Sequence, residues 1–186
     1  MRVSRIFLPV CLAAVCAACS LDYQDSAGQQ ELAENIPEAI FTDFSHMAVK
    51  ETRLVFTLEA SEARLFQKQK RTELTGVRFR EYDDNGKISV EGRANRAVYH
   101  TDTENAEIYG AVYFRSNQEE ITMYAESLFW DRKARMLTAN AEEAVRIVKD
   151  DGSFITGRGF SADARKKSIN YSSGVRGTYV HKDEEK

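Results

Sequence analysis

Residues 94–114 read ANRAVYHTDTENAEIYGAVYF, which is an alternating apolar run, a polar loop and a second alternating run. The same pattern occurs four times, anchored on small residues at intervals of about 31–34 residues: Ala60, Ala94, Ala125 and Gly157. A recurrence at this interval predicts a repeated structural unit. Because one such unit cannot bury an apolar face alone, we expect the units to stack on one another.

The alternation itself predicts strands. Leu54, Phe56 and Leu58 alternate with less apolar positions, and the same period of two recurs at Val77 and Phe79. Such a period is typical of a strand with one buried and one solvated face. The step of three from the anchor to the next buried-type residue, as from Ala94 to Ala97, breaks the period and predicts a bulge or bend.

Two further segments complete the expected hairpins. The turn signals DDNG (83–86) and KDDG (149–152) are expected to close the first and third units. Residues 135–145 are rich in Ala and Glu, as helices are, but they occupy a slot that the other repeats fill with a strand. We therefore predict a strand there.

The N-terminus predicts export. Two arginines precede an apolar run over residues 6–18, which is too short to span a bilayer of about 20 residues. We predict a signal peptide over residues 1–18. The residues Cys16-Ala17-Ala18-Cys19 resemble a bacterial lipobox, although Cys16 stands where Leu is usual, and this resemblance implies lipidation of Cys19. The alternative is an ordinary secretory signal with another cut site.

The rest of the chain divides into a polar tether over residues 19–36, a folded domain over 37–180 that begins at Pro37, and a charged tail over 181–186. The three cysteines, Cys11, Cys16 and Cys19, all precede residue 20, so the domain needs a real apolar core rather than disulfides or zinc–thiolate sites. A formal net charge of −3 disfavours nucleic acid as a partner. We find no catalytic constellation, metal set or phosphate loop, and expect no enzyme activity and no cofactor.

The repeats resemble the LptC and LptA (OstA-like) family of lipopolysaccharide-transport periplasmic proteins, most closely LptC. The residues that carry the resemblance are EGRANRAVYHTDTENAEIYGAVYF, AESLFWDRKARMLTANAEEAVRI and DDGSFITGRGFSADARKKSINYSSGVRGTYV, within a similarity that covers about residues 37–180. The family implies an all-β fold, an open twisted β-jelly roll that is V-shaped, with two facing antiparallel sheets. LptC is usually held by a transmembrane helix, whereas here we expect a lipid on Cys19.

The resemblance also implies a function. An acyl chain in water costs about 0.8 kcal/mol per methylene, and an open apolar groove offsets that cost without catalysis. The candidates for lining the groove are the residues of the expected dry face: Leu54, Phe56, Leu58, Val77, Phe79, Ile88, Val90, Ile108, Val112, Phe114, Ile121, Met123, Val145, Ile147 and Ile155. The alternative is that these residues pack against each other as a closed core.

The expected partners are lipopolysaccharide or a similar glycolipid, the subunits of an inner-membrane ABC transporter, and an LptA-like periplasmic protein bound by edge-strand pairing. By resemblance, the edge near residues 41–47 would meet the transporter and the edge near 170–180 would meet the next jelly roll. We expect a periplasmic domain anchored to the inner rather than the outer membrane. The alternatives are an LptA-like bridge subunit, a half-barrel lipoprotein shuttle, or a structural, protein-binding envelope lipoprotein with a closed β core.

Overall fold

The computed structural model describes residues 35–181. The expected signal peptide, Cys19, nearly all of the tether and residues 182–186 lie outside this range. The strands belong to a compact unit that starts at Pro37, and it is this unit alone that is described below.

All regular structure in residues 35–181 is β-strand, which confirms the predicted all-β fold. The strands, all paired antiparallel, are β1 (Ala39–Lys50), β2 (Arg53–Phe66), β3 (Arg71–Tyr82), β4 (Ile88–His100), β5 (Ala106–Ser116), β6 (Ile121–Asp131), β7 (Met136–Thr138), β8 (Ala144–Lys149), β9 (Phe154–Arg158), β10 (Ser161–Asp163), β11 (Ser168–Asn170) and β12 (Ser173–Thr178).

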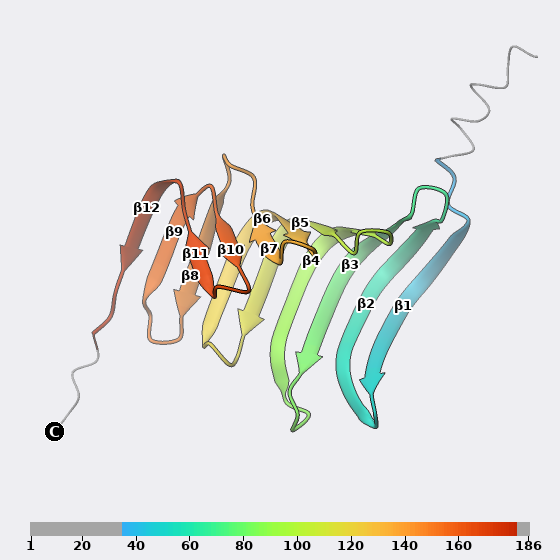
Figure 1. The fold of residues 1–186 in the computed structure, drawn as a ribbon, viewed down its shortest axis with the longest axis horizontal. Coiled ribbons are helices and arrows are strands. Elements are labelled where there is room, and N and C mark those ends of the chain that lie inside the picture. The colour runs from blue at the N-terminus through green and yellow to red at the C-terminus, as the bar shows by residue number, and fades with distance from the viewer. Residues whose placement is uncertain (1–34, 182–186) are drawn as a thin grey trace, which may run out of the picture. The chain divides into compact units, whose positions relative to one another are not determined.

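The strands β1 to β6 pair in chain order, and the sheet divides at β6. The first half of β6, from Ile121 to Tyr124, pairs with β8, whereas its last residues, from Phe129 to Asp131, pair with β7. One branch continues through β10 to β11, and the other through β9 to β12. Figure 1 shows the long curved strands side by side and the short strands of the two branches beyond them. This is the predicted open jelly roll, because the long strands contribute to both of its sheets.

Bulges mark where the long strands pass from one sheet to the other. The register between β4 and β5 shifts between Arg93 and Arg96, and that between β5 and β6 shifts between Tyr109 and Val112. The irregularity predicted between Ala94 and Ala97 is therefore confirmed. Gly110 adopts a φ of +75° at the second bulge, a conformation in which glycine carries no Cβ penalty.

The later repeats depart from the prediction of continuous strands. The expected strand over 135–145 is wrong at residues 139–143, where the chain makes a turn between β7 and β8. Because β7 and β8 pair with different halves of β6, the chain must leave one sheet and enter the other at this point. Similar breaks separate β9 from β10 and β11 from β12.

Both predicted hairpin turns are confirmed. The amide of Gly86 donates to the carbonyl of Asp83 at 3.0 Å, and the amide of Gly152 donates to that of Lys149 at 3.0 Å. The first turn joins β3 to β4, and the second joins β8 to β9.

The core forms two clusters of buried apolar side chains along the bend. One contains Ala94, Val112, Met123, Leu128, Val145, Ile147 and Phe160. The other contains Ala60, Ala63, Leu74, Val77 and Ala97. The repeat anchors Ala60, Ala94 and Gly157 are all buried, so the small residues of the repeat lie where the two sheets come closest to each other.

Candidate lipid groove

An apolar row crosses the inner face of the sheet from β2 to β9. Strand register places these residues directly opposite one another in the order Leu58, Phe79, Gly92, Phe114, Met123, Ile147 and Ile155. Because side chains alternate along a strand, all of them face the same side of the sheet. The row therefore joins the long strands to the β8–β9–β12 branch in one apolar surface.

Aromatic rings fill the β2–β5 part of this surface. The ring centroids of Phe56 and Phe79 lie 6.3 Å apart, and those of Phe79 and Phe114 lie 5.7 Å apart. Gly92 occupies the strand between Phe79 and Phe114, where a Cβ would stand 2.2 Å from the Phe79 ring. The absence of a side chain at Gly92 thus lets Phe79 lie across β4 toward Phe114.

The candidate lining residues differ in exposure. Those that are buried in the core clusters are Val77, Val112, Met123, Val145 and Ile147. Those that remain partly exposed are Leu54, Phe56, Leu58, Phe79, Ile88, Val90, Ile108, Phe114, Ile121 and Ile155. The second set offers most of the surface that a ligand can reach in this conformation, and of the first set Ile147 lines the groove described below. Ile108 lies beyond the β5 bulge and packs against both clusters.

A groove of about 540 Å³ opens at the C-terminal end of the row. Three of the candidate lining residues, Ile121, Ile147 and Ile155, are among the residues that line it. The remaining lining residues were not among those candidates: Lys149, Ser153, Phe154, Ile169, Tyr171, Val175, Arg176, Gly177, Thr178 and Tyr179. They come from strands after the sheet divides, where alternation alone does not tell which branch a residue joins.

Tyr171 is the most unusual residue of this groove. Its ring packs on Phe160 with centroids 5.5 Å apart and lies against Gly157, where a Cβ would stand 2.8 Å away. Its hydroxyl is buried without a hydrogen-bond partner among the described residues, and burial raises its pKa. A buried hydroxyl of this kind can donate to an oxygen of a bound molecule.

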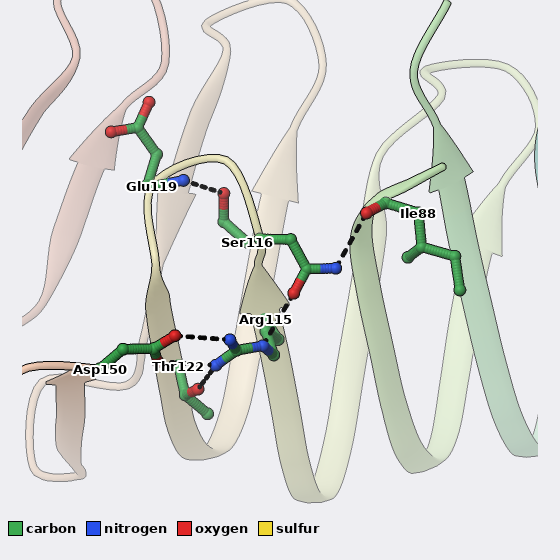
Figure 2. A network of polar contacts seen from close by, with 7 residues as sticks. Ile88, Arg115, Ser116, Glu119, Thr122 and Asp150 are labelled. Carbon is green, nitrogen blue, oxygen red and sulfur yellow. Dashed lines mark hydrogen bonds and ion pairs between the residues drawn. The ribbon is translucent and has the colours of Figure 1, made fainter. Parts of the chain in front are cut away.

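A polar network fixes the strand ends near the groove (Figure 2). The Arg115 guanidinium donates to both Asp150 carboxylate oxygens, at 2.8 and 2.9 Å, and to the Thr122 hydroxyl at 3.1 Å. It also donates to the amide oxygen of Asn117, whose nitrogen donates to the carbonyl of Ile88 at 2.8 Å. The hydrogen bonds from Arg115 hold the pKa of Asp150 below its usual value. The network joins the β5–β6 hairpin to the start of β4 and to the β8–β9 turn.

A second group of titratable side chains lies at the surface of β4 and β5. His100 Nε2 lies 2.8 Å from Glu107 Oε1, and the Tyr109 hydroxyl donates to the same carboxylate. The hydrogen bond from Tyr109, followed by that from His100, lowers the pKa of Glu107. Within residues 35–181, no three His, Cys, Asp or Glu side chains are grouped as metal ligands would be. That same part of the chain holds no helix with the length and apolarity needed to cross a bilayer.

Two similar proteins extend over most of the chain. An uncharacterized protein of Treponema pallidum (strain Nichols) is 26% identical over 188 residues, which cover 94% of this chain and 88% of the relative. The crystal structure of LptH from Pseudomonas aeruginosa, the LptA-homologous periplasmic component of its lipopolysaccharide transport device, superposes with a TM-score of 0.53 at 11% identity. That match covers 68% of this chain and 95% of LptH, and it shows a shared fold.

The model of the LptC-related lipopolysaccharide-assembly family matches residues 9–180, which includes every strand described above. The chain therefore belongs to the LptC-related family.

Proposed function

We propose that this protein is a periplasmic, membrane-anchored component of lipopolysaccharide export. It receives the acyl chains of lipopolysaccharide or a related glycolipid from an inner-membrane ABC transporter and passes them to a partner jelly roll. The observation that carries the proposal is the apolar row from Leu58 to Ile155, which leads into the groove of about 540 Å³. Membership of the LptC-related family supports the role in lipopolysaccharide transport.

The partly exposed residues of the row suit a protein that binds lipid reversibly and passes it on. Phe56, Phe79 and Phe114 offer apolar surface to an acyl chain at one side while their rings contact each other at the other. Each methylene that moves onto such a surface recovers up to about 0.8 kcal/mol. A half-open surface recovers only a part of this, so the lipid can also leave.

The two ends of the sheet offer edges for partners. Within residues 35–181, β2 is the one strand that pairs with β1, whose exposed side chains include Ile40, Met47 and Val49, with Met47 64% exposed. In the same part of the chain β9 is the one strand that pairs with β12, next to the exposed Val175 and Tyr179. Open edges of this kind accept an added strand. We assign β1 to the transporter side and β12 to an LptA-like protein, with the domain held near the membrane by a lipid on Cys19.

A second candidate function is a structural, protein-binding lipoprotein with a closed core. The observation that favours it is the burial of Val77, Val112 and Val145 between the sheets, which leaves them no surface for a ligand. An LptA-like bridge subunit is a variant of the first proposal, and the match to 95% of LptH supports it.

Photocrosslinking in cells tests the proposal. We expect a photoreactive residue at Phe56, Phe114 or Ile155 to form adducts that contain lipopolysaccharide, because each side chain is partly exposed on the inner row. The matched control is Phe129, an aromatic residue that is 38% exposed and directly follows the buried Leu128, so it faces away from the core. Adducts are detected by blotting for lipopolysaccharide after irradiation.

Equal adduct yields at Phe129 and at the three inner positions would remove the evidence for a groove. Normal expression of all variants with no lipid adduct at any inner position would leave the closed-core function as the better account.

A further inference from the structure

The outer face of the same strands carries a row of arginines and tyrosines. Strand register places the members directly opposite one another across β3, β4, β5, β6, β8, β9 and β12, in the order Arg78, Arg93, Tyr113, Tyr124, Arg146, Thr156 and Arg176. We call these residues the arginine row. On β2 the same register line continues to Glu59, which stands directly opposite Arg78, so a carboxylate adjoins the row at this end. From Arg78 to Arg176 the row contains no carboxylate, although the whole chain carries a formal net charge of −3.

The four arginines of this row are exposed, and none forms an ion pair with another described residue. Neighbouring arginines differ in this respect, because Arg80 pairs with Glu59 and Arg115 pairs with Asp150. Moreover, Arg78 and Arg93 stand directly opposite each other on adjacent strands. Like charges in that position destabilise a sheet. Glu59 stands opposite Arg78 on β2 and offsets part of this repulsion, whereas the strand partner of Arg93 on its other side is the uncharged Tyr113. An anion bound between them would remove the repulsion.

Aromatic side chains hold the arginines in place along the row. The Arg93 guanidinium lies 4.9 Å from the centre of the Tyr113 ring, and that of Arg146 lies 4.2 Å from the centre of the Phe154 ring. Tyr113 in turn meets Tyr124 edge to face at 5.8 Å. These contacts orient the cations without neutralising them, so their charge stays available to a partner.

We propose that the arginine row binds the anionic phospholipid headgroups of a membrane surface. A guanidinium group can donate two parallel hydrogen bonds to the oxygens of one phosphate. Tyrosine, which has an apolar ring and a polar hydroxyl, is enriched at membrane interfaces. Arg78, Arg93 and Tyr113 line a hollow of about 330 Å³ together with Glu91. From there the row extends across the face of the sheet, which fits a surface that presents many headgroups. At the C-terminal end the row and the groove share Arg176, and Phe154 contacts both. Arg78, Arg93 and Arg146 do not line the groove, so the proposal can be tested on them separately.

The composition of the row favours a membrane over an acidic protein. Protein interfaces centre on a fully buried apolar patch. Among residues 35–181, exposed large apolar side chains lie on β1, on β4 to β6 and on the C-terminal strands, and the only one in the row is Tyr124, at 45% exposure.

Vesicle flotation tests the proposal. Every variant is expressed from residue 20 onward, which keeps the whole compact unit that starts at Pro37, so that neither the apolar run over residues 6–18 nor an acyl group adds to binding. The vesicles contain phosphatidylcholine alone or with about one third phosphatidylglycerol. We expect binding to the anionic vesicles that salt weakens, and little binding to phosphatidylcholine. Reversing two charges with Arg93→Glu and Arg146→Glu is expected to weaken this binding by about tenfold or more.

The matched control is the pair Lys87→Glu and Lys133→Glu, which makes the same change in net charge at exposed turns outside the row. We expect this control to keep its affinity within about twofold, and thermal unfolding verifies that both variants fold. An equal loss in the control pair, or no binding to anionic vesicles, would overturn the proposal. Binding to polyglutamate without binding to vesicles would also overturn it, in favour of an acidic protein. Lipid crosslinking inside the groove does not enter this test, so the two proposals can fail separately.

Discussion

Gly92 shows how one residue shapes the inner face. Its backbone is not in the left-handed region, so alanine is disfavoured there only by the 2.2 Å approach of its Cβ to the Phe79 ring. We predict that Gly92→Ala lowers the free energy of unfolding by about 1–3 kcal/mol, the usual cost of overpacking. Urea unfolding followed by tryptophan fluorescence measures the change.

The double variant Gly92→Ala with Phe79→Ala supplies the control. Without the Phe79 ring, the added methyl group has no close neighbour of this kind, so the cost of Gly92→Ala should fall to near zero. Equal costs in the two backgrounds would mean that the contact between Gly92 and Phe79 does not govern the packing of the row.

The bulges are the feature of the elements that allows long strands to serve two sheets. Gly110 in the β5 bulge and Gly86 in the β3–β4 turn have nearly the same φ, +75° and +74°. A Cβ on Gly110 would stand 2.7 Å from the Asn95 side chain, whereas one on Gly86 would meet nothing within 4 Å. We predict that Gly86→Ala costs about 1 kcal/mol for its backbone alone. Gly110→Ala should cost about 1–3 kcal/mol more.

Denaturant titrations of the two variants give this difference directly. If Gly86→Ala and Gly110→Ala destabilise the protein equally, backbone conformation accounts for both costs and the bulge packing adds nothing.

Alternation was sufficient to predict the long strands. In β2, which pairs with a strand on each side, Leu54, Phe56 and Leu58 all point to the inner face of the sheet. It could not predict the turn at residues 139–143. Local sequence does not tell that β7 and β8 pair with different halves of β6, since that is decided by contacts with a strand earlier in the chain. The repeat pattern therefore predicted one continuous strand at the place where the sheet divides.

The arrangement of the whole sheet determines which side chains meet, and the sequence did not reveal this for either face. Arg78, Arg93 and Arg146 are far apart in the chain, and only the register of five strands brings them into one row. For the same reason the lining role of Tyr171 was missed. It lies between β11, which pairs with β10, and β12, which pairs with β9, so its position depends on both branches of the sheet. Ile121, Ile147 and Ile155 lie beside the groove because each follows its own strand's alternation, and their contact with lipid stays a prediction.

Removal of the last strand, β12, tests whether it contributes to the stability of the domain or to lipid binding. Every residue of β12 is exposed, and within residues 35–181 its only strand partner is β9. We therefore predict that a chain ending after Ser172 still folds, with a Tm lower by about 2–4 °C. It loses the groove wall formed by Val175 to Tyr179, so lipopolysaccharide adducts at Ile155 should fall several-fold while those at the distant Phe56 persist. Thermal unfolding and the same photocrosslinking measure both effects, with a chain ending after His181 as the control. Loss of folding in the shorter chain would show that β12 stabilises the sheet, and unchanged adducts at Ile155 would show that the groove does not depend on it.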